Sequence, residues 1–216
     1  MNQIRKIVAK KHVINYNQII KEIRDLNTLD IKKIINEEKD TIRKCLLCKK
    51  YLSSNMYSML LEKHIKEMFN LDNKKNNASG DAVSQNGLNI EIKVSFMAKN
   101  GNCNIVQLRP HYNIDYYLIM FYDVYFGEYG EIYWILCEAK KIYELIPEYG
   151  EYSHGTIKKN GPIAEVLNPE KKYEYSLRPN LKNRSSKKYK LWNLLKRYSS
   201  NVYDINNIFS NINESV

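Results

Sequence analysis

Residues 80–96 read GDAVSQNGLNIEIKVSF, and this stretch decides the fold. Over residues 88–96 apolar and polar side chains alternate, which is typical of a β-strand with one buried face. The Asn86-Gly87 pair before this strand is a turn signal and predicts a β-hairpin. The polar face of the second strand carries Glu91 and Lys93. An acid and an ammonium group are therefore expected side by side above a buried core.

The length of the hairpin loop decides whether Asp81 joins that polar face. A two-residue turn places Asp81 opposite Ile92, on the apolar face. A three-residue loop, 85–87, with Gly87 in a left-handed bulge, places Asp81 opposite Glu91 instead. A shared site for the two acids needs the second register, and we predict it.

Two carboxylates beside a lysine are suited to metal-dependent chemistry on a phosphate. Mg²⁺ prefers carboxylate oxygens and keeps several waters. A bound metal lowers the pKa of a water and neutralises charge on a phosphoryl oxygen. Lys93 supplies positive charge where negative charge develops in the transition state. The alternative is a solvated sheet face with a cross-strand ion pair.

The pattern Gly80-Asp81 followed by Glu91-Ile92-Lys93 resembles the PD-(D/E)XK nuclease superfamily, the fold of most type II restriction endonucleases. Gly80 stands where the motif of the family is written with proline, and the nine residues between the two acids are at the short end. The resemblance extends from about Ser54 to Asp123. It implies a restriction-endonuclease-like core behind an N-terminal helical region.

The resemblance also implies a role for each residue of the motif. Asp81, Glu91 and the backbone carbonyl of Ile92 would hold Mg²⁺, and Lys93 would orient or help to activate the attacking water. The implied reaction is hydrolysis of a phosphodiester by in-line attack of a metal-activated water. A further glutamate is implied on the helix before the hairpin. Glu62 is the first candidate for it and Glu67 the second.

The expected protein is a Mg²⁺-dependent, sequence-specific type II restriction endonuclease acting on double-stranded DNA. A single small domain that cuts both strands needs two active sites, which the two-fold symmetry of a homodimer supplies. Two alternatives remain: a non-catalytic DNA-binding module in which the acids are structural, and a repair or resolving nuclease that uses the same site on a DNA structure.

The net charge of +10 favours a polyanionic partner, which is a nucleic acid or an anionic membrane surface. The chain has no apolar run that could span a bilayer and no apolar core of a signal peptide at its N-terminus. We therefore expect a cytoplasmic protein that binds DNA and no membrane.

Several residues outside the motif are candidates for DNA contacts. Gln107 and Arg109 are suited to base edges or to phosphates, or else lie on a solvated helix or edge. His154 contacts DNA or a metal, or is a solvated turn residue. A basic helix near the C-terminus either follows the phosphate backbone or is an ordinary amphipathic helix. Its candidate contacts are Arg184, Lys187 and Lys188.

The order of patterns predicts an α/β (α+β) fold, with a mixed central β-sheet flanked by helices in a single domain of residues 1–216. Its parts are an N-terminal helical part (1–70), a catalytic core (71–146) and a loop-rich part with a basic helix (147–216). The nearly continuous apolar runs at 115–123 and 132–137 are both expected at the centre of the sheet.

The remaining patterns predict helices and one short strand. Helices are expected over 31–46 with Asp30 as a cap, from Ser53 or Ser54 to Phe69, over 139–146 up to Pro147, and from Ser185 or Ser186 to 199; the strand is expected over 173–177. The apolar face of the second helix is predicted to comprise Met56, Met59, Leu60, His64, Met68 and Phe69. Cys45 and Cys48 have metal-like spacing, and form either a zinc site or an inert reduced pair.

Overall fold

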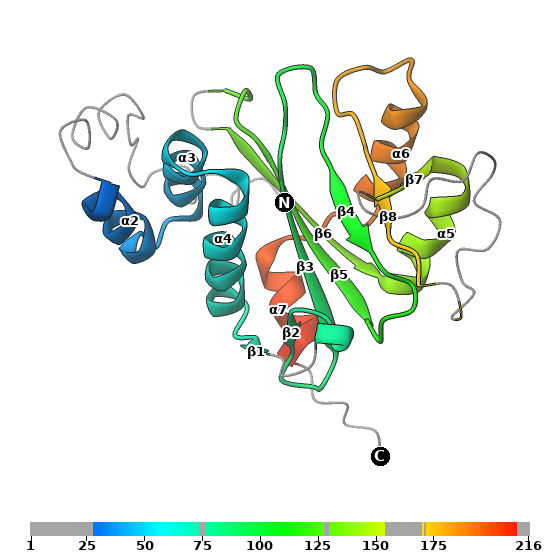
Figure 1. Ribbon diagram of the computed structural model, residues 1–216, viewed down its shortest axis with the longest axis horizontal. Helices are drawn as coiled ribbons and strands as arrows, with labels where there is room; N and C mark the ends of the chain where they lie inside the picture. Colours follow the sequence, from blue (N-terminus) through cyan, green and yellow to red (C-terminus); the bar gives the residue numbers. More distant parts are fainter. Residues whose placement is uncertain (1–27, 74–76, 128–129, 154–169, 171, 211–216) are drawn as a thin grey trace, which may run out of the picture.

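A mixed five-stranded sheet in the order β1-β2-β3-β5-β6 forms the centre of the fold (Figure 1). The computed structural model describes residues 28–73, 77–127, 130–153, 170 and 172–210. Strand β3 runs parallel to β5 and antiparallel to β2, so the sheet is mixed as predicted. Its strands are β1 (Asp72–Asn73), β2 (Ala82–Val83), β3 (Asn89–Phe96), β5 (Tyr116–Asp123) and β6 (Glu131–Glu138).

One face of the sheet is covered by four helices, whose buried residues form one apolar cluster with Ile90, Ile92 and Phe96 of β3. Alternation along β3 and β5 sends every second side chain to this face. Figure 1 shows α4 and α7 on this side of the sheet. The helices are α2 (Thr28–Glu37), α3 (Thr41–Tyr51), α4 (Ser54–Met68) and α7 (Val202–Ser210).

The opposite face is covered by two helices and a second sheet in the order β4-β8-β7, in which neighbouring strands are antiparallel. Tyr117, Ile119 and Phe121 of β5 pack into this second cluster. The elements are β4 (Ile105–Leu108), α5 (Ala139–Tyr149), β7 (Gly150–Tyr152), β8 (Tyr175–Leu177) and α6 (Lys187–Lys196); a 3₁₀-helix, η3 (Asn77–Ser79), precedes β2.

The hairpin loop between β2 and β3 has the predicted three residues. The Ser84 amide donates to the Leu88 carbonyl at 3.0 Å, and the Gly87 amide donates to the Ser84 carbonyl at 2.9 Å. Gly87 has a φ of +86°, in the left-handed region. Residues 85–87 therefore form the loop, with glycine at the position that needs this conformation.

The register that follows from this loop is confirmed where β2 and β3 pair, since Ala82 lies opposite Ile90. Asp81 stands just before β2, and its amide donates to the Ile90 carbonyl at 2.9 Å. The position of Asp81 opposite Glu91, which the metal-site hypothesis requires, stays a prediction.

The predicted helix over 31–46 is wrong, because the structure divides it into α2 and α3. Asp40 is the N-cap of α3, and its Oδ1 accepts from the Arg43 amide at 2.8 Å. A capped N-terminus starts a new helix at this point. Asp30 is not a cap, since α2 begins at Thr28 and Asp30 lies in its first turn.

The predicted apolar face of α4 is confirmed in part, and its residues Leu60 and Met68 are half-buried against the core. His64 and Phe69 are buried as expected, together with Leu61 and Ile65, which the sequence analysis left out. Met59 is 74% exposed, so it does not belong to the core. Helical spacing predicted the helix correctly. Two apolar stripes overlap on its surface, and tertiary packing decides which of their side chains are buried.

The strand predicted at 132–137 lies at the end of its sheet and not at the centre. Strand β6 pairs only with β5 in the named sheet. The chain after α6 runs along its other edge: the Leu136 amide donates to the Tyr198 carbonyl at 3.1 Å and the Ser200 amide donates to the Trp134 carbonyl at 3.0 Å. This cover explains an edge strand as apolar as β6.

The C-terminal part contains two differences from the prediction. Helix α5 continues through Pro147 to Tyr149, and the next residue, Gly150, starts strand β7 in a region predicted as extended or looped. Pro147 fits because a proline near the end of a helix removes only one amide donor from the helix and its ring is exposed here. The helix expected from Ser185 or Ser186 is α6, with Ser186 as its N-cap. His154 and most of the predicted loop after β7 lie outside the described residues.

We expect Asp40→Ala to lower the free energy of unfolding by about 1 kcal/mol, because it removes the side-chain cap of α3. Ser53→Ala is the matched control, since Ser53 stands at the N-cap of α4 without a side-chain hydrogen bond to the helix. Urea unfolding followed by circular dichroism measures both changes. Equal losses in the two variants would show that the Asp40 cap does not stabilise the break between α2 and α3.

Candidate active site

Gly80 brings the backbone before Asp81 directly against β3. Its φ is +85°, and a Cβ atom added there would lie 2.6 Å from the carbonyl oxygen of Ile90. Proline, with φ fixed near about −65°, cannot adopt this conformation. The local backbone therefore requires glycine at this position. This conformation explains why Gly80 stands where the motif of the PD-(D/E)XK superfamily is written with proline.

Asp81 occupies the edge of β3 just beyond the end of β2. Strand β2 begins at Ala82, so the pairing stops there. The Ile92 amide donates instead to Oδ2 of Asp81 at 2.8 Å. The carboxylate thus replaces a neighbouring strand as the acceptor for this amide, which fixes its direction beside β3.

Glu91 and Lys93 form a close, largely buried ion pair on β3. The distance from Nζ of Lys93 to Oε1 of Glu91 is 2.6 Å, and their side chains are 15% and 5% exposed. Their register partners on β5 are Ile119 and Tyr117, two residues of the second cluster. The pair therefore lies on the face of the sheet that β4 and α5 cover.

The electrostatics of this pair are unbalanced. Burial raises the pKa of the Glu91 carboxyl, the Lys93 ammonium lowers it, and the Asp81 carboxylate raises it again. The Asp81 carboxylate is thus within electrostatic reach of Glu91, whose ammonium partner is Lys93. An additional cation at this edge would relieve both the burial cost and the repulsion.

Two buried tyrosines link the neighbouring strand β5 to Arg109, and the sequence analysis did not identify them. The hydroxyls of Tyr117 and Tyr143 are 3.3 Å apart, and the Tyr143 hydroxyl donates to the Arg109 carbonyl at 3.3 Å. Burial raises the pKa of Tyr143 to about 12, so it remains a donor at neutral pH. Tyr117 is the partner of Glu91 in the parallel pairing of β3 with β5. No local sequence pattern encodes that pairing, so the sequence could not identify Tyr117.

Gln107 and Arg109 lie on and just after β4. Gln107 is exposed, has a φ of +56°, and its amide donates to Oγ of Ser153 at 3.2 Å. Arg109 is turned toward the protein, where its Nε is 2.7 Å from Oε1 of Glu174. Neither residue lies on a helix; Gln107 is exposed and Arg109 is partly exposed.

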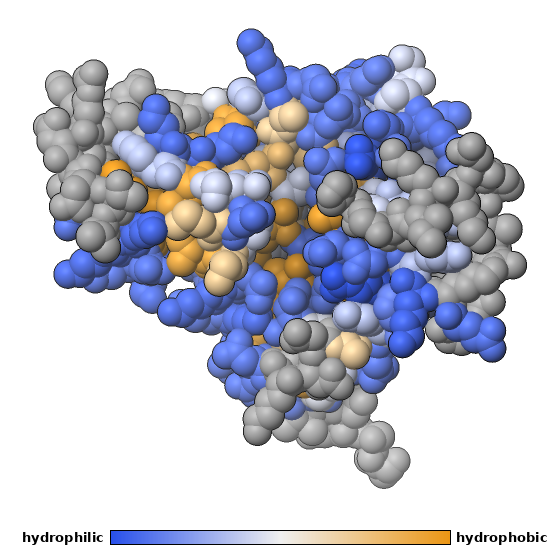
Figure 2. Space-filling model, in the orientation of Figure 1, coloured by the Kyte–Doolittle hydropathy of each residue, from blue (hydrophilic) through white to orange (hydrophobic). Residues whose placement is uncertain are grey.

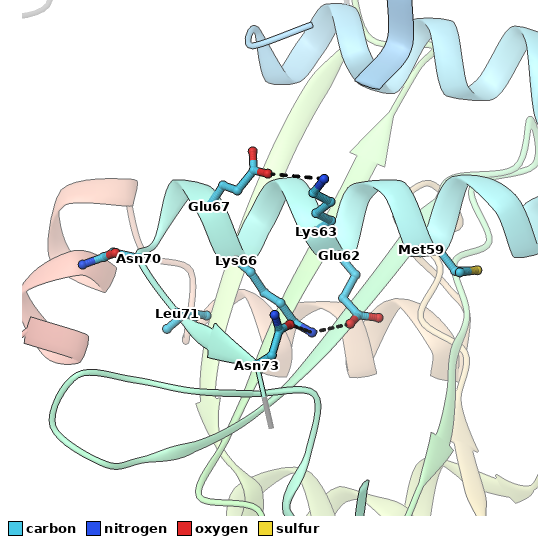
Figure 3. A pocket seen from close by; sticks show the side chains of 8 residues that line it. All are labelled: Met59, Glu62, Lys63, Lys66, Glu67, Asn70, Leu71 and Asn73. Atoms are coloured by element: carbon cyan, nitrogen blue, oxygen red, sulfur yellow. Dashed lines mark hydrogen bonds and ion pairs between the residues drawn. The ribbon is translucent and has the colours of Figure 1, made fainter. Parts of the chain in front are cut away.

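Glu62 and Glu67 lie on α4, which packs on the other face of the sheet (Figure 3). Oε1 of Glu62 accepts from Nζ of Lys66 at 2.6 Å, and Glu67 pairs with Lys63 at 3.9 Å. These residues line a hollow of about 510 Å³ beside β1. In the part of the chain that the structure describes, no three His, Cys, Asp or Glu side chains are grouped to hold a metal. The structure therefore does not bring the predicted helix glutamate to Asp81 and Glu91.

The predicted basic contacts of the C-terminal part lie at the surface. Arg184, Lys187 and Lys188 are exposed at the start of α6, and Nζ of Lys187 is 5.4 Å from the centre of the Tyr149 ring. In Figure 2, hydrophilic residues gather over the β4 side of the molecule, whereas hydrophobic residues gather over α3 and α4.

The Cys45 and Cys48 thiols are buried in the core between α3 and its neighbours. Burial raises the pKa of both thiols, that of Cys48 to about 12. A raised thiol pKa disfavours the thiolate that a zinc ion needs. Both side chains therefore pack as small apolar groups, in agreement with the reduced-pair alternative.

Comparison of the chain with protein-family models, with curated proteins and with solved structures found no match. The function is therefore argued from the geometry of Asp81, Glu91 and Lys93 and from the residues around them. Within the described ranges, no helix is both long and apolar enough to cross a membrane.

We expect Gly80→Ala to destabilise the protein more than Gly87→Ala. Both glycines have φ values near +85°, so alanine costs about 1–2 kcal/mol at either position. At Gly80 the new Cβ also collides with the Ile90 carbonyl, whereas at Gly87 no atom lies within 4 Å. Urea unfolding measures both losses. Equal losses would mean that the close approach of Gly80 to β3 does not exist in solution.

We expect Asp81→Asn to keep or raise the free energy of unfolding in the absence of metal, by up to about 1 kcal/mol. The Asn carbonyl can still accept from the Ile92 amide, while the repulsion with Glu91 disappears. Mg²⁺ should raise the melting temperature of the original protein and not that of the variant.

Asp115→Asn is the control for this substitution. Oδ2 of Asp115 also accepts a β3 amide, from Asn89 at 2.7 Å, but its replacement relieves no repulsion with Glu91. We therefore expect Asp115→Asn to give no gain in stability, because its carbonyl still accepts the amide but no repulsion is relieved, and to leave the Mg²⁺ effect intact. A larger stability loss in Asp81→Asn than in Asp115→Asn would indicate a structural ion-pair network rather than a metal site.

Proposed function

We propose that this protein is a Mg²⁺-dependent endonuclease that hydrolyses phosphodiester bonds of double-stranded DNA, with a restriction-endonuclease-like core. One observation carries the proposal: Asp81, Glu91 and Lys93 meet at the edge of β3, with two carboxylates for one ammonium group. Stable solvated sheet faces pair unlike charges in equal number, whereas excess acid beside a lysine suits a cation and a phosphate.

The residues at this edge fit Mg²⁺. This ion is commonly bound through one or two carboxylates, with waters and substrate phosphates as its other ligands. Asp81, Glu91 and the Ile92 carbonyl would hold it, so a third acidic residue is not required. When bound, Mg²⁺ lowers the pKa of a coordinated water and neutralises charge on the phosphoryl oxygens.

The protein's own residues contribute position and charge to the hydrolysis. The Ile92 amide fixes the direction of the Asp81 carboxylate. Lys93 lies 2.6 Å from Glu91, close enough to orient a water held beside that carboxylate and to stabilise negative charge on the phosphate. In the reaction, the oxygen of water bonds to phosphorus as the bond to the leaving oxygen breaks. Tyr117 and Tyr143 close the inner side of the site against bulk water.

Duplex DNA as substrate is supported by charge and by the distribution of exposed basic residues. The net charge is +10, and Arg184, Lys187 and Lys188 stand exposed at the start of α6. Such residues bind phosphates without reading sequence. Exposed Gln107 is suited to a base edge. Cutting both strands with one small domain calls for a homodimer, which we include in the proposal.

We expect the original protein to cut plasmid or phage DNA into discrete fragments with Mg²⁺, and Lys93→Ala to lose cleavage by about 10²-fold or more while DNA binding is retained. Gel electrophoresis measures cleavage, and a mobility-shift assay measures binding. Lys66→Ala is the matched control, because Lys66 also lies 2.6 Å from a glutamate with its side chain 14% exposed, but on the opposite face of the sheet.

The outcomes separate the proposal from its alternatives. Full cleavage by Lys93→Ala would place the active site elsewhere in the chain. Salt-sensitive DNA binding without cleavage by the original protein would identify a non-catalytic DNA-binding module. Cleavage confined to junctions or damaged DNA would identify a structure-specific repair or resolving nuclease.

A further inference from the structure

Arg109 is held firmly by three contacts. Its Nε is 2.7 Å from Oε1 of Glu174, and its guanidinium carbon lies 5.0 Å from the centre of the Tyr112 ring. Its backbone carbonyl accepts from the Tyr143 hydroxyl at 3.3 Å. The side chain is only 21% exposed. A long cationic side chain fixed in this way has already lost most of its conformational freedom, so binding a ligand costs little further entropy.

The contact with Glu174 leaves most of the guanidinium free for a ligand. Arginine has five N–H donors, and the ion pair uses the one on Nε. The terminal amino groups of Arg109 make no hydrogen bond within the described residues. These paired donors match the oxygens of a phosphate. A structural clamp between β4 and β8 would have no need for free donors in a partly buried position.

The guanidinium also lies within electrostatic reach of the candidate active site. The pKa of the Glu91 carboxyl is affected most by burial and by the charges of Lys93 and Asp81. The positive charge of Arg109 has a smaller effect and lowers this pKa. The chain of hydroxyls from Tyr117, the register partner of Glu91, through Tyr143 ends on the carbonyl of Arg109. Arg109 and Glu91 are therefore linked by electrostatics, and the two tyrosines place the Arg109 backbone near the strand that pairs with Glu91.

We propose that Arg109, fixed by Glu174 and Tyr112, is a phosphate-binding residue of this site and contacts the DNA phosphate that lies against Asp81 and Glu91. The proposal rests on the proposed function. It distinguishes Arg109 from Gln107, because a base-reading residue must reach into a groove, whereas Arg109 is mostly buried and restrained. Gln107, exposed at the irregular part of the β4–β8 pairing, has the freedom that base contact requires.

The balance of charge makes this contact depend on the metal. When ionised, Arg109 and Glu174 pair with each other, while Asp81 adds a negative charge beside the Glu91–Lys93 pair, so the edge of β3 carries an excess negative charge. A phosphate is repelled by this charge until a divalent cation changes its sign. Arg109 should therefore contribute to DNA binding mainly when Mg²⁺ is present.

The test measures binding of a linear plasmid fragment as a function of salt, in a Lys93→Ala background so that the DNA is not cut. With Mg²⁺, we expect Arg109→Ala to reduce the slope of log Kd against log salt by about one unit. With EDTA the slope should be unchanged by the substitution. In the protein that retains Lys93, we expect Arg109→Ala to lower the single-turnover cleavage rate by about 10²-fold.

Arg109→Lys keeps the positive charge but removes the paired N–H donors of the guanidinium, so it tests whether those paired donors are needed. It should keep the salt slope and the melting temperature, but lower the cleavage rate by about tenfold, because lysine is a point charge. This variant also decides the matter if Arg109→Ala does not fold. Arg178→Ala is the matched control: Arg178 pairs with Glu151 of β7 at 3.4 Å, and we expect its loss to change neither slope nor rate.

Unchanged salt slope and cleavage rate in Arg109→Ala, with only a lower melting temperature, would overturn the proposal and leave a structural clamp to Glu174. A changed sequence preference, with the salt slope retained, would overturn it in favour of base reading. Failure of the proposed function itself appears separately, as absence of cleavage by the original protein with Mg²⁺.

Discussion

The hydrogen bond from the Ile92 amide to the Asp81 carboxylate is the contact on which the site depends. Strand β2 is only two residues long, so the edge of β3 is open just where the acids stand. An open strand edge exposes amides that need acceptors. Here a carboxylate serves as that acceptor, and it is aimed by Gly80, whose backbone lies too close to Ile90 for any Cβ. The local fold of the hairpin and the placement of the charge are thus one arrangement.

This arrangement is unfavourable for stability unless a further cation is present. Glu91 is 4% exposed and has Lys93 as its close partner, while Asp81 adds a second negative charge. Burying a carboxylate is costly, and one hydrogen-bonded ammonium compensates only part of that cost when a second acid is nearby. Clusters of this kind are retained mostly at functional sites, where stability is exchanged for binding or catalysis.

Much of the hairpin could be predicted from sequence because its determinants are local. Period-two alternation defines the strand, and Gly87 selects the loop length and hence the register of Ala82 with Ile90. The neighbours of the site could not be predicted in the same way. Tyr117 reaches Glu91 through a parallel pairing, and Arg109 reaches Glu174 across 65 positions of sequence. Such contacts are set by the packing of whole elements, which no window of sequence contains.

For a related reason, the described part of the chain does not group Glu62 with Asp81 and Glu91. Helical periodicity identified α4, but it did not decide which side of α4 faces the sheet, and Leu61 and Ile65 take that place. Glu62 consequently meets Lys66, one turn along the same helix, and the two charges balance.

The contrast between the two lysine–glutamate pairs shows why only one of them suggests function. Lys66–Glu62 and Lys93–Glu91 have the same 2.6 Å separation and similar exposure of the lysine. The helix pair is electrically complete and forms whenever α4 forms. The strand pair has the carboxylate of Asp81 near it. The three-residue hairpin loop and the close approach of Gly80 to β3 place Asp81 there. Distance and burial alone therefore do not distinguish the two pairs; the second carboxylate beside Glu91 does, and it is the feature on which the proposed metal site rests.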